Sequence, residues 1–156
     1  MILEMMCKNR PLVSEMSIGS TQILFVCVHN AGRSQMAEAY LNHLAQVRGV
    51  KAVASSAGTL QGGTLNPVAV EVMAEDGVSL VGHFPKSLTQ DMANEADVIV
   101  SMGCGVDAAA CPAKFLVTED WGLDDPAGQP IEVVRSVRDQ VRSRVEQLLD
   151  ELKDRS

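Results

Sequence analysis

The sequence predicts an α/β domain with a small parallel sheet covered by helices on both faces. Short apolar runs alternate along the chain with segments of helical periodicity, the pattern of right-handed βαβ units. The 156 residues are enough for one domain with one core. We therefore expect a single three-layer domain over residues 21–156. Residues 1–20 show no clear periodicity and are expected to form a flexible N-terminal extension.

Four strands and four helices can be placed from apolar patterning and from turn residues. The strands are expected at residues 21–27, at 51–56 leading into Ser56-Ala57-Gly58, at 98–102 and at 115–118. The helices are expected at residues 33–47, 67–76, 88–96 and 131–152. The last and longest helix carries one apolar face, formed by Val134, Val137, Val141, Val145, Leu148 and Leu152.

Composition and charge exclude several classes of partner. The formal net charge is -7, so no basic surface is expected to neutralise the phosphates of a nucleic acid. No apolar run has the length of a membrane span, and the N-terminus lacks the apolar block of a signal peptide. A cytoplasmic protein without a membrane or nucleic-acid partner is therefore expected.

One loop carries the strongest chemical signal. Cys27 ends the first strand and Arg33 begins the first helix, with five residues between them. Such a loop points backbone N–H groups and a helix N-terminus at one spot, which suits a tetrahedral oxyanion and favours the thiolate of the cysteine. Arg33 can clamp two oxygens of that anion. The residues expected to bind the anion are Val28, His29, Asn30, Ala31, Gly32, Arg33 and Ser34.

Asp125 is a candidate general acid at the same edge of the sheet. It lies in the loop after the fourth expected strand, where Asp124-Asp125-Pro126 alone would indicate only a turn. Ligands of parallel sheets bind beyond the carboxyl ends of the strands, so Asp125 can approach Cys27. A carboxyl group there can protonate a departing oxygen.

Cys104 and Cys111 follow the third expected strand and form a second candidate group. Two such cysteines are often small buried apolar residues, but a pair on the same rim as a reactive thiolate suits a resolving relay. A disulfide between them requires Cα atoms within about 7 Å, so the segment would have to fold back. A zinc site is not favoured, because the three histidines are not spaced with the cysteines as zinc ligands would be.

With these motifs together, the chain resembles the thioredoxin-coupled arsenate reductases of the low-molecular-weight protein tyrosine phosphatase-like family. The resemblance runs from about Gln22 to Leu152 and rests on five motifs. They are the segment from Cys27 to Glu38, Ser56-Ala57-Gly58, Asn66-Pro67, the Cys104/Cys111 pair, and Glu119-Asp120-Trp121-Gly122-Leu123-Asp124-Asp125-Pro126. It implies a flavodoxin-like, four-stranded parallel sheet flanked by helices.

The resemblance also implies a mechanism. Cys27 attacks arsenate held by the loop amides and Arg33, while Asp125 helps an oxygen to leave. Cys104 then attacks Cys27 and expels arsenite, and Cys111 attacks Cys104 to give a disulfide that thioredoxin reduces. In this scheme Asn30 shapes the loop and the Ser34 hydroxyl donates to the Cys27 thiolate. No organic cofactor and no metal is implied.

Three alternatives stay open from the sequence. A tyrosine phosphatase would flank its pocket with aromatic side chains, but here Pro126 is followed by Ala127-Gly128 and the chain is only 3% aromatic. A non-enzymatic anion-binding or redox-sensing module would leave Asp125, Cys104 and Cys111 without a shared role. An arsenate–thiol transferase that uses a small thiol would not need Cys104 and Cys111.

The resemblance raises one question about ions. Some family members bind potassium through residues that match Asn30, Glu38 and Ser56, together with an aspartate. Lys86 stands in the place of that aspartate here, so its ammonium is expected to take the electrostatic role of the cation. The alternative is that Lys86 is an ordinary solvated lysine.

Overall fold

A four-stranded parallel sheet organises the chain, as predicted. The computed structural model describes residues 20–60, 63–102 and 119–155. The strands are β1 (Thr21–Cys27), β2 (Ala52–Gly58), β3 (Val98–Ser101) and β4 (Glu119–Asp120). Their order in the sheet is β2-β1-β3-β4, and all three pairings are parallel. The predicted α/β class and the parallel sheet are confirmed.

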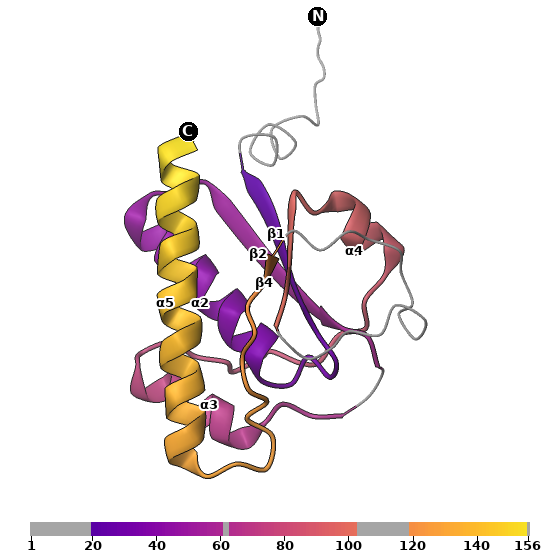
Figure 1. Cartoon of the computed structure of the whole chain (residues 1–156), viewed down its shortest axis with the longest axis vertical. Helices are drawn as coiled ribbons and strands as arrows, with labels where there is room; N and C mark the ends of the chain where they lie inside the picture. The colour runs from indigo at the N-terminus through magenta and orange to yellow at the C-terminus, as the bar shows by residue number, and fades with distance from the viewer. Residues whose placement is uncertain (1–19, 61–62, 103–118, 156) are drawn as a thin grey trace, which may run out of the picture.

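Helices cover the sheet unequally on its two sides (Figure 1). The helices α2 (Arg33–Arg48), α3 (Pro67–Glu75) and α5 (Ile131–Arg155) pack on the side of the larger apolar cluster. The short helix α4 (Gln90–Glu95) lies on the opposite side, where Ala93 joins a smaller cluster. The long α5 packs against both α2 and α3. These layers leave the carboxyl ends of the strands accessible at one edge.

The central strand β1 is apolar from Ile23 to Cys27, where both of its faces are buried. Ile23, Phe25 and Cys27 belong to the larger cluster, whereas Leu24 and Val26 belong to the smaller one. Side chains alternate across a strand, so a continuous apolar run supplies both faces. This run places Cys27 at the end of the best-buried strand in the sheet.

Local signals set most helix boundaries where the sequence placed them. The Asn66 side chain accepts from the amides of Val68 and Ala69 and caps α3, and Gly77 follows that helix with a φ of 77°. The helix α4 is shorter than the predicted 88–96, because Thr89 caps it by accepting from the Met92 amide at 3.2 Å. Leu88 instead donates its backbone N–H to Gly58.

Among the described residues, the last strand β4 consists of Glu119 and Asp120. Residues 115–118, where the fourth strand was predicted, lie outside the described residues, as does the expected N-terminal extension up to residue 19. The described part of β4 pairs Glu119 with Val100 and Asp120 with Ser101. This pairing places the loop that follows β4 at the same edge as Cys27.

A buried tyrosine links three helices. Tyr40 of α2 donates its hydroxyl to Asp76 at 2.7 Å, and Arg142 of α5 contacts the same carboxylate at 2.6 Å. The hydrogen bond from Tyr40, with that from Arg142, holds the pKa of Asp76 below its usual range, and burial raises the pKa of Tyr40. The charged form of Asp76 therefore stabilises the contact between α2, α3 and α5.

We predict that Asp76→Asn lowers the free energy of unfolding at neutral pH by about 1–2 kcal/mol. The folded-state pKa of Asp76 is depressed, so its stabilisation is present above about pH 4, the ordinary value for aspartate, and is lost as the pH falls through the folded-state pKa. Urea unfolding as a function of pH should show the deficit shrinking in acid. Asp150→Asn, which removes an exposed partner of Arg48, is the control and should change little. A deficit of equal size at every pH would contradict this account.

Candidate functional site

The loop between β1 and α2 forms the centre of the site. It turns through Asn30, which has a φ of 55°, a left-handed conformation that asparagine tolerates better than most residues. Gly32 precedes α2 and has no side chain with which to accept from the amides of the first turn. Those amides therefore remain available to an anion at the helix N-terminus.

Cys27 is buried at the carboxyl end of β1 and is surrounded by hydrogen-bond donors. Its Sγ accepts from the Asn30 backbone N–H at 3.0 Å and lies 2.9 Å from Ser34 Oγ. Asn30 Nδ2 donates to Ser34 Oγ at 2.8 Å. A thiolate has no hydrogen to give, so the Ser34 hydroxyl is the donor whenever Cys27 is ionised. Two donors aimed at one sulfur stabilise its thiolate form.

Arg33 connects the loop to the ends of two other strands. Its Nη1 donates to the carbonyl oxygen of Met102, just beyond β3, at 3.0 Å and to that of Leu123, beyond β4, at 2.8 Å. The side chain is buried, so these bonds fix the guanidinium plane with little freedom. Its remaining N–H groups can serve a bidentate contact with an oxyanion.

Asp125 lies beside Arg33, at the edge of the sheet where the topology placed it with Cys27. Its Oδ2 is 3.7 Å from Arg33 Nη2, while its Oδ1 accepts from the Ala127 amide at 3.0 Å. The side chain is 55% exposed, so the carboxyl group can exchange protons with solvent. The neighbouring Pro126 lies close to Gly32 and brings this loop against the anion loop.

These groups line one cavity of about 360 Å³. The cavity is bounded by Cys27, Arg33 and their loop, by residues 63–67 ahead of α3, and by residues 125–128. Among the described residues that line it, none is phenylalanine, tyrosine or tryptophan. The cavity thus places the Cys27 sulfur, the Arg33 guanidinium and the Asp125 carboxyl group in one space.

The end of β2 and the two residues after it pack against the anion loop. Thr59 and Leu60 donate their backbone N–H groups to the carbonyls of Cys27 and Val28. Gly58 permits this approach, because a Cβ at that position would lie 2.7 Å from the Val28 carbonyl oxygen. The backbone N–H of Asn66 donates to Ala31 on another side of the loop. The anion loop is therefore held by backbone contacts on two sides.

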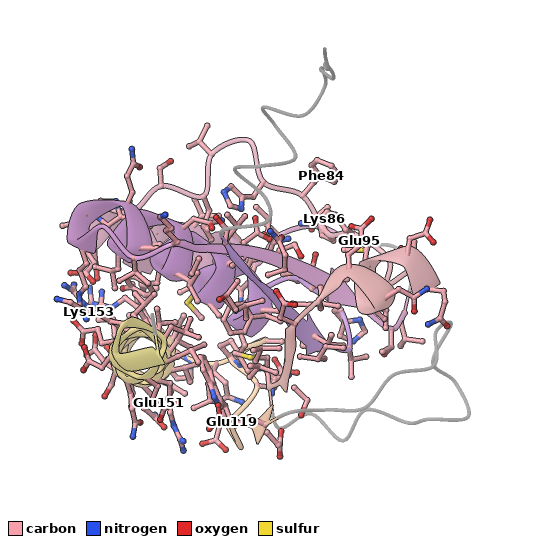
Figure 2. All side chains as sticks on the ribbon, turned by 90° about the horizontal axis from the view of Figure 1, so that it is seen from above. Phe84, Lys86, Glu95, Glu119, Glu151 and Lys153 are labelled. Atoms are coloured by element: carbon pink, nitrogen blue, oxygen red, sulfur yellow. The ribbon has the colours of Figure 1, made fainter. Side chains whose placement is uncertain are left out.

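Glu38 and Lys86 form a charged pair next to the loop. Lys86 Nζ lies 3.4 Å from Glu38 Oε1, and Ser56 Oγ donates to the same oxygen at 2.6 Å. The Lys86 backbone N–H also donates to Asn30 Oδ1 at 2.8 Å. Phe84 projects outward beside Lys86, and its ring lies 5.7 Å from the ammonium (Figure 2). Lys86 is thus a partly buried member of this cluster rather than a solvated surface residue.

The structure adds Gln35 and His83, which sequence reasoning did not select. Gln35 is fully buried behind the loop and contacts both Asn30 and the chain at residues 83–84. Gln35 belongs to the motif from Cys27 to Glu38. Nothing in a single sequence indicates that it contacts residues 83–84, which lie almost fifty positions further along the chain.

Two of the predicted site residues cannot be placed. Cys104 and Cys111 lie in residues 103–118, outside the described residues. In the part of the chain that the structure describes, no group of three or more His, Cys, Asp or Glu side chains is arranged to hold a metal ion. No helix among those residues is long and apolar enough to cross a membrane.

The family model for low molecular weight phosphotyrosine protein phosphatases matches residues 22–156. The chain belongs to this family. A Synechocystis sp. relative, glutaredoxin arsenate reductase, is 36% identical over 129 residues, which cover 82% of this chain and 95% of the relative. Members of the family thus include reductases as well as phosphatases.

Solved structures of family members agree with the fold. An arsenate reductase in a phosphate-binding state superposes with a TM-score of 0.72 at 34% identity, covering 85% of this chain and 98% of that chain. A thioredoxin-dependent arsenate reductase of Corynebacterium glutamicum gives a TM-score of 0.72 at 32% identity, covering 92% of this chain and 67% of that one.

We predict that Gly58→Ala displaces the anion loop and reduces turnover roughly 10- to 100-fold, because a shift of about 1 Å at a reacting group is costly. The added methyl group meets backbone atoms, which cannot move aside independently. Gly77→Ala is the matched control, since it strains a residue with a φ of 77° far from the loop. Both variants should lose thermal stability, but only Gly58→Ala should weaken phosphate binding by calorimetry. Equal phosphate affinity in the two variants would refute the assignment.

We predict that the melting temperature and activity do not change when potassium replaces sodium at equal ionic strength. The Lys86 ammonium already faces Glu38, so a cation has little to add there. Lys86→Asp should create a potassium dependence, whereas Lys51→Asp, a change at an exposed lysine, should not. Clear stimulation of the unmodified protein by potassium would refute this prediction.

Proposed function

We propose that this protein reduces arsenate to arsenite in the cytoplasm, with Cys27 as the nucleophile and thioredoxin as the final reductant. The observation that carries the proposal is the geometry at Cys27, a buried sulfur with two donors at 3.0 Å or less, in a cavity shared with Arg33 and Asp125. The reductases among its relatives support arsenate as the substrate. Thiol chemistry of this kind suits a compartment in which thiols are kept reduced.

In the first step the cavity holds arsenate and breaks one As–O bond. The backbone amides of the loop and the free N–H groups of Arg33 bind three oxygens of the tetrahedral anion. The Cys27 thiolate attacks arsenic and forms an S–As bond. Asp125 gives a proton to the departing oxygen, which leaves as water. The exposure of Asp125 allows the proton to be replaced from solvent.

The reduction itself moves two electrons from sulfur to arsenic. The thiolate of Cys104 attacks Cys27 Sγ, and the electron pair of the S–As bond stays with arsenic, which leaves as arsenite. The Cys27–Cys104 disulfide that results is then attacked by the Cys111 thiolate, which frees Cys27. Thioredoxin reduces the final Cys104–Cys111 disulfide by the same exchange chemistry. These three exchange steps rest on the sequence and on the resemblance to reductases.

A phosphatase side activity follows from the same cradle. Arsenate and phosphate share their shape and charge, so the cavity can accept a phosphomonoester and Cys27 can form a thiophosphate that water hydrolyses. The walls formed by residues 63–67 and 125–128 offer no phenyl or indole ring for stacking against a phenol. Phosphotyrosine is therefore a poor fit, and we expect hydrolysis to be the slower reaction.

We predict that cysteine variants separate the two reactions. Cys27→Ser abolishes both, because each begins with the same nucleophile. Cys104→Ser and Cys111→Ser stop reductase cycling but spare hydrolysis, which needs no electrons. The measurements are arsenate-dependent NADPH oxidation with thioredoxin and its reductase, and release of p-nitrophenol from p-nitrophenyl phosphate.

Cys7→Ser is the control for this series and should leave both reactions unchanged, since Cys7 precedes the residues expected to form the domain. Continued thioredoxin-coupled turnover by either Cys104→Ser or Cys111→Ser would overturn the relay. Hydrolysis without any arsenate reduction by the unmodified protein would leave the phosphatase as the better assignment.

A further inference from the structure

A directed chain of hydrogen bonds connects the segment at residues 83–86 to the sulfur of Cys27. The three side chains within it, Asn30, Ser34 and Gln35, are all fully buried. An amide side chain can point either way, so the direction of such a chain must be fixed by groups whose role as donor or acceptor is known. Here two backbone groups, one of Phe84 and one of Lys86, supply that information.

The Phe84 carbonyl fixes the orientation of Gln35. A carbonyl oxygen only accepts, so the Gln35 atom that lies 2.9 Å away must be Nε2. The same Nε2 donates to the Asn30 carbonyl at 3.1 Å and to Asn30 Oδ1 at 2.9 Å. Its two hydrogens thus serve three acceptors, one hydrogen being shared by the two Asn30 oxygens. Gln35 Oε1 faces His83 Nδ1 at 3.1 Å, so that nitrogen must carry a hydrogen.

The Lys86 backbone fixes the orientation of Asn30. A backbone N–H only donates, so the Asn30 atom 2.8 Å from it must be Oδ1. Asn30 Nδ2 then donates to Ser34 Oγ, and the Ser34 hydroxyl donates to Cys27 Sγ when that sulfur is a thiolate. The two amides, Gln35 and Asn30, are therefore oriented by backbone groups outside the anion loop.

We propose that Gln35 is a positioning residue for the Cys27 thiolate. It pins both the carbonyl and the side chain of Asn30, the loop residue with the left-handed backbone. Both donors to the Cys27 sulfur depend on this conformation of Asn30. The first is the Asn30 backbone N–H, and the second is the Ser34 hydroxyl, which Asn30 Nδ2 holds in place. Gln35 touches neither the sulfur nor the cavity, so it acts through Asn30. The inference rests on the proposed function in taking Cys27 as the nucleophile.

The test follows Cys27 itself rather than turnover. Iodoacetamide alkylation of the full-length protein is measured against pH, and the Cys27 peptide is quantified by mass spectrometry so that the other cysteines do not interfere. In Gln35→Met, which keeps the length of the side chain but donates nothing, the alkylation midpoint moves to higher pH. At a pH below both midpoints alkylation is about three- to tenfold slower, because less thiolate is present.

Gln35→Glu serves as the second variant and tests direction. Its carboxylate still accepts from His83 but faces the Phe84 and Asn30 carbonyls without a hydrogen to donate, so the midpoint should again move to higher pH. Asn42→Leu is the matched control. Asn42 is another amide of α2 that bonds a backbone, here the N–H and carbonyl of Ala54 in β2, far from the loop. It should lose stability without moving the Cys27 midpoint.

The outcomes separate the two proposals. Midpoints of both Gln35 variants equal to that of Asn42→Leu and of the unmodified protein would overturn the positioning role. If Gln35→Met does not fold, Gln35→Glu decides by the same measurement. A Cys27 that is no more reactive than ordinary cysteine in the unmodified protein would instead count against the proposed function.

Discussion

The guanidinium of Arg33 is the contact on which the rest of the site depends. Three strands end at the same edge of the sheet, but a parallel sheet alone does not hold the loops that follow them together. Arg33 does so by donating from one nitrogen to the carbonyls of Met102 and Leu123, each beyond a different strand. Because both acceptors are backbone atoms, the loops are fixed relative to Cys27 rather than merely near it. Because Nη1 makes both of these bonds, Nη2 and Nε are the guanidinium nitrogens left for a ligand.

The anion loop combines a demanding backbone with support from outside. The positive φ of Asn30 and the tight approach of Gly58 make the loop unfavourable as an isolated segment. The surrounding elements compensate through backbone hydrogen bonds from Leu60 and Asn66 and through the buried amide of Gln35. A loop held in this way presents its amides without reorganising when an anion binds, which is the condition for strong electrostatic stabilisation.

The sequence predicted the features whose cause is local. The apolar run of β1 and the helical periodicity that begins at Pro67 are each visible within a few residues, and the bounds of β1 and the start of α3 are confirmed. Topology then allowed one non-local prediction, the convergence of Asp125 with Cys27, because parallel strands end at the same edge, and both residues line one cavity. The contacts of Gln35 with residues 83–84 could not be predicted, since they depend on how a loop packs and leave no periodic pattern. The roles of Cys104 and Cys111 in the disulfide relay stay predictions, because both lie outside the described residues.

The central claim is that Cys27 takes arsenate and that this chain alone supplies the two electrons. It is tested most directly in a single turnover, with fully reduced protein mixed with arsenate in the absence of thioredoxin. Arsenite is quantified, and the disulfide is located by mass spectrometry of peptides. The account predicts about one arsenite per chain, released together with a Cys104–Cys111 disulfide and a free Cys27. Reduced protein that binds arsenate but releases no arsenite, with all its cysteines still free, would contradict it.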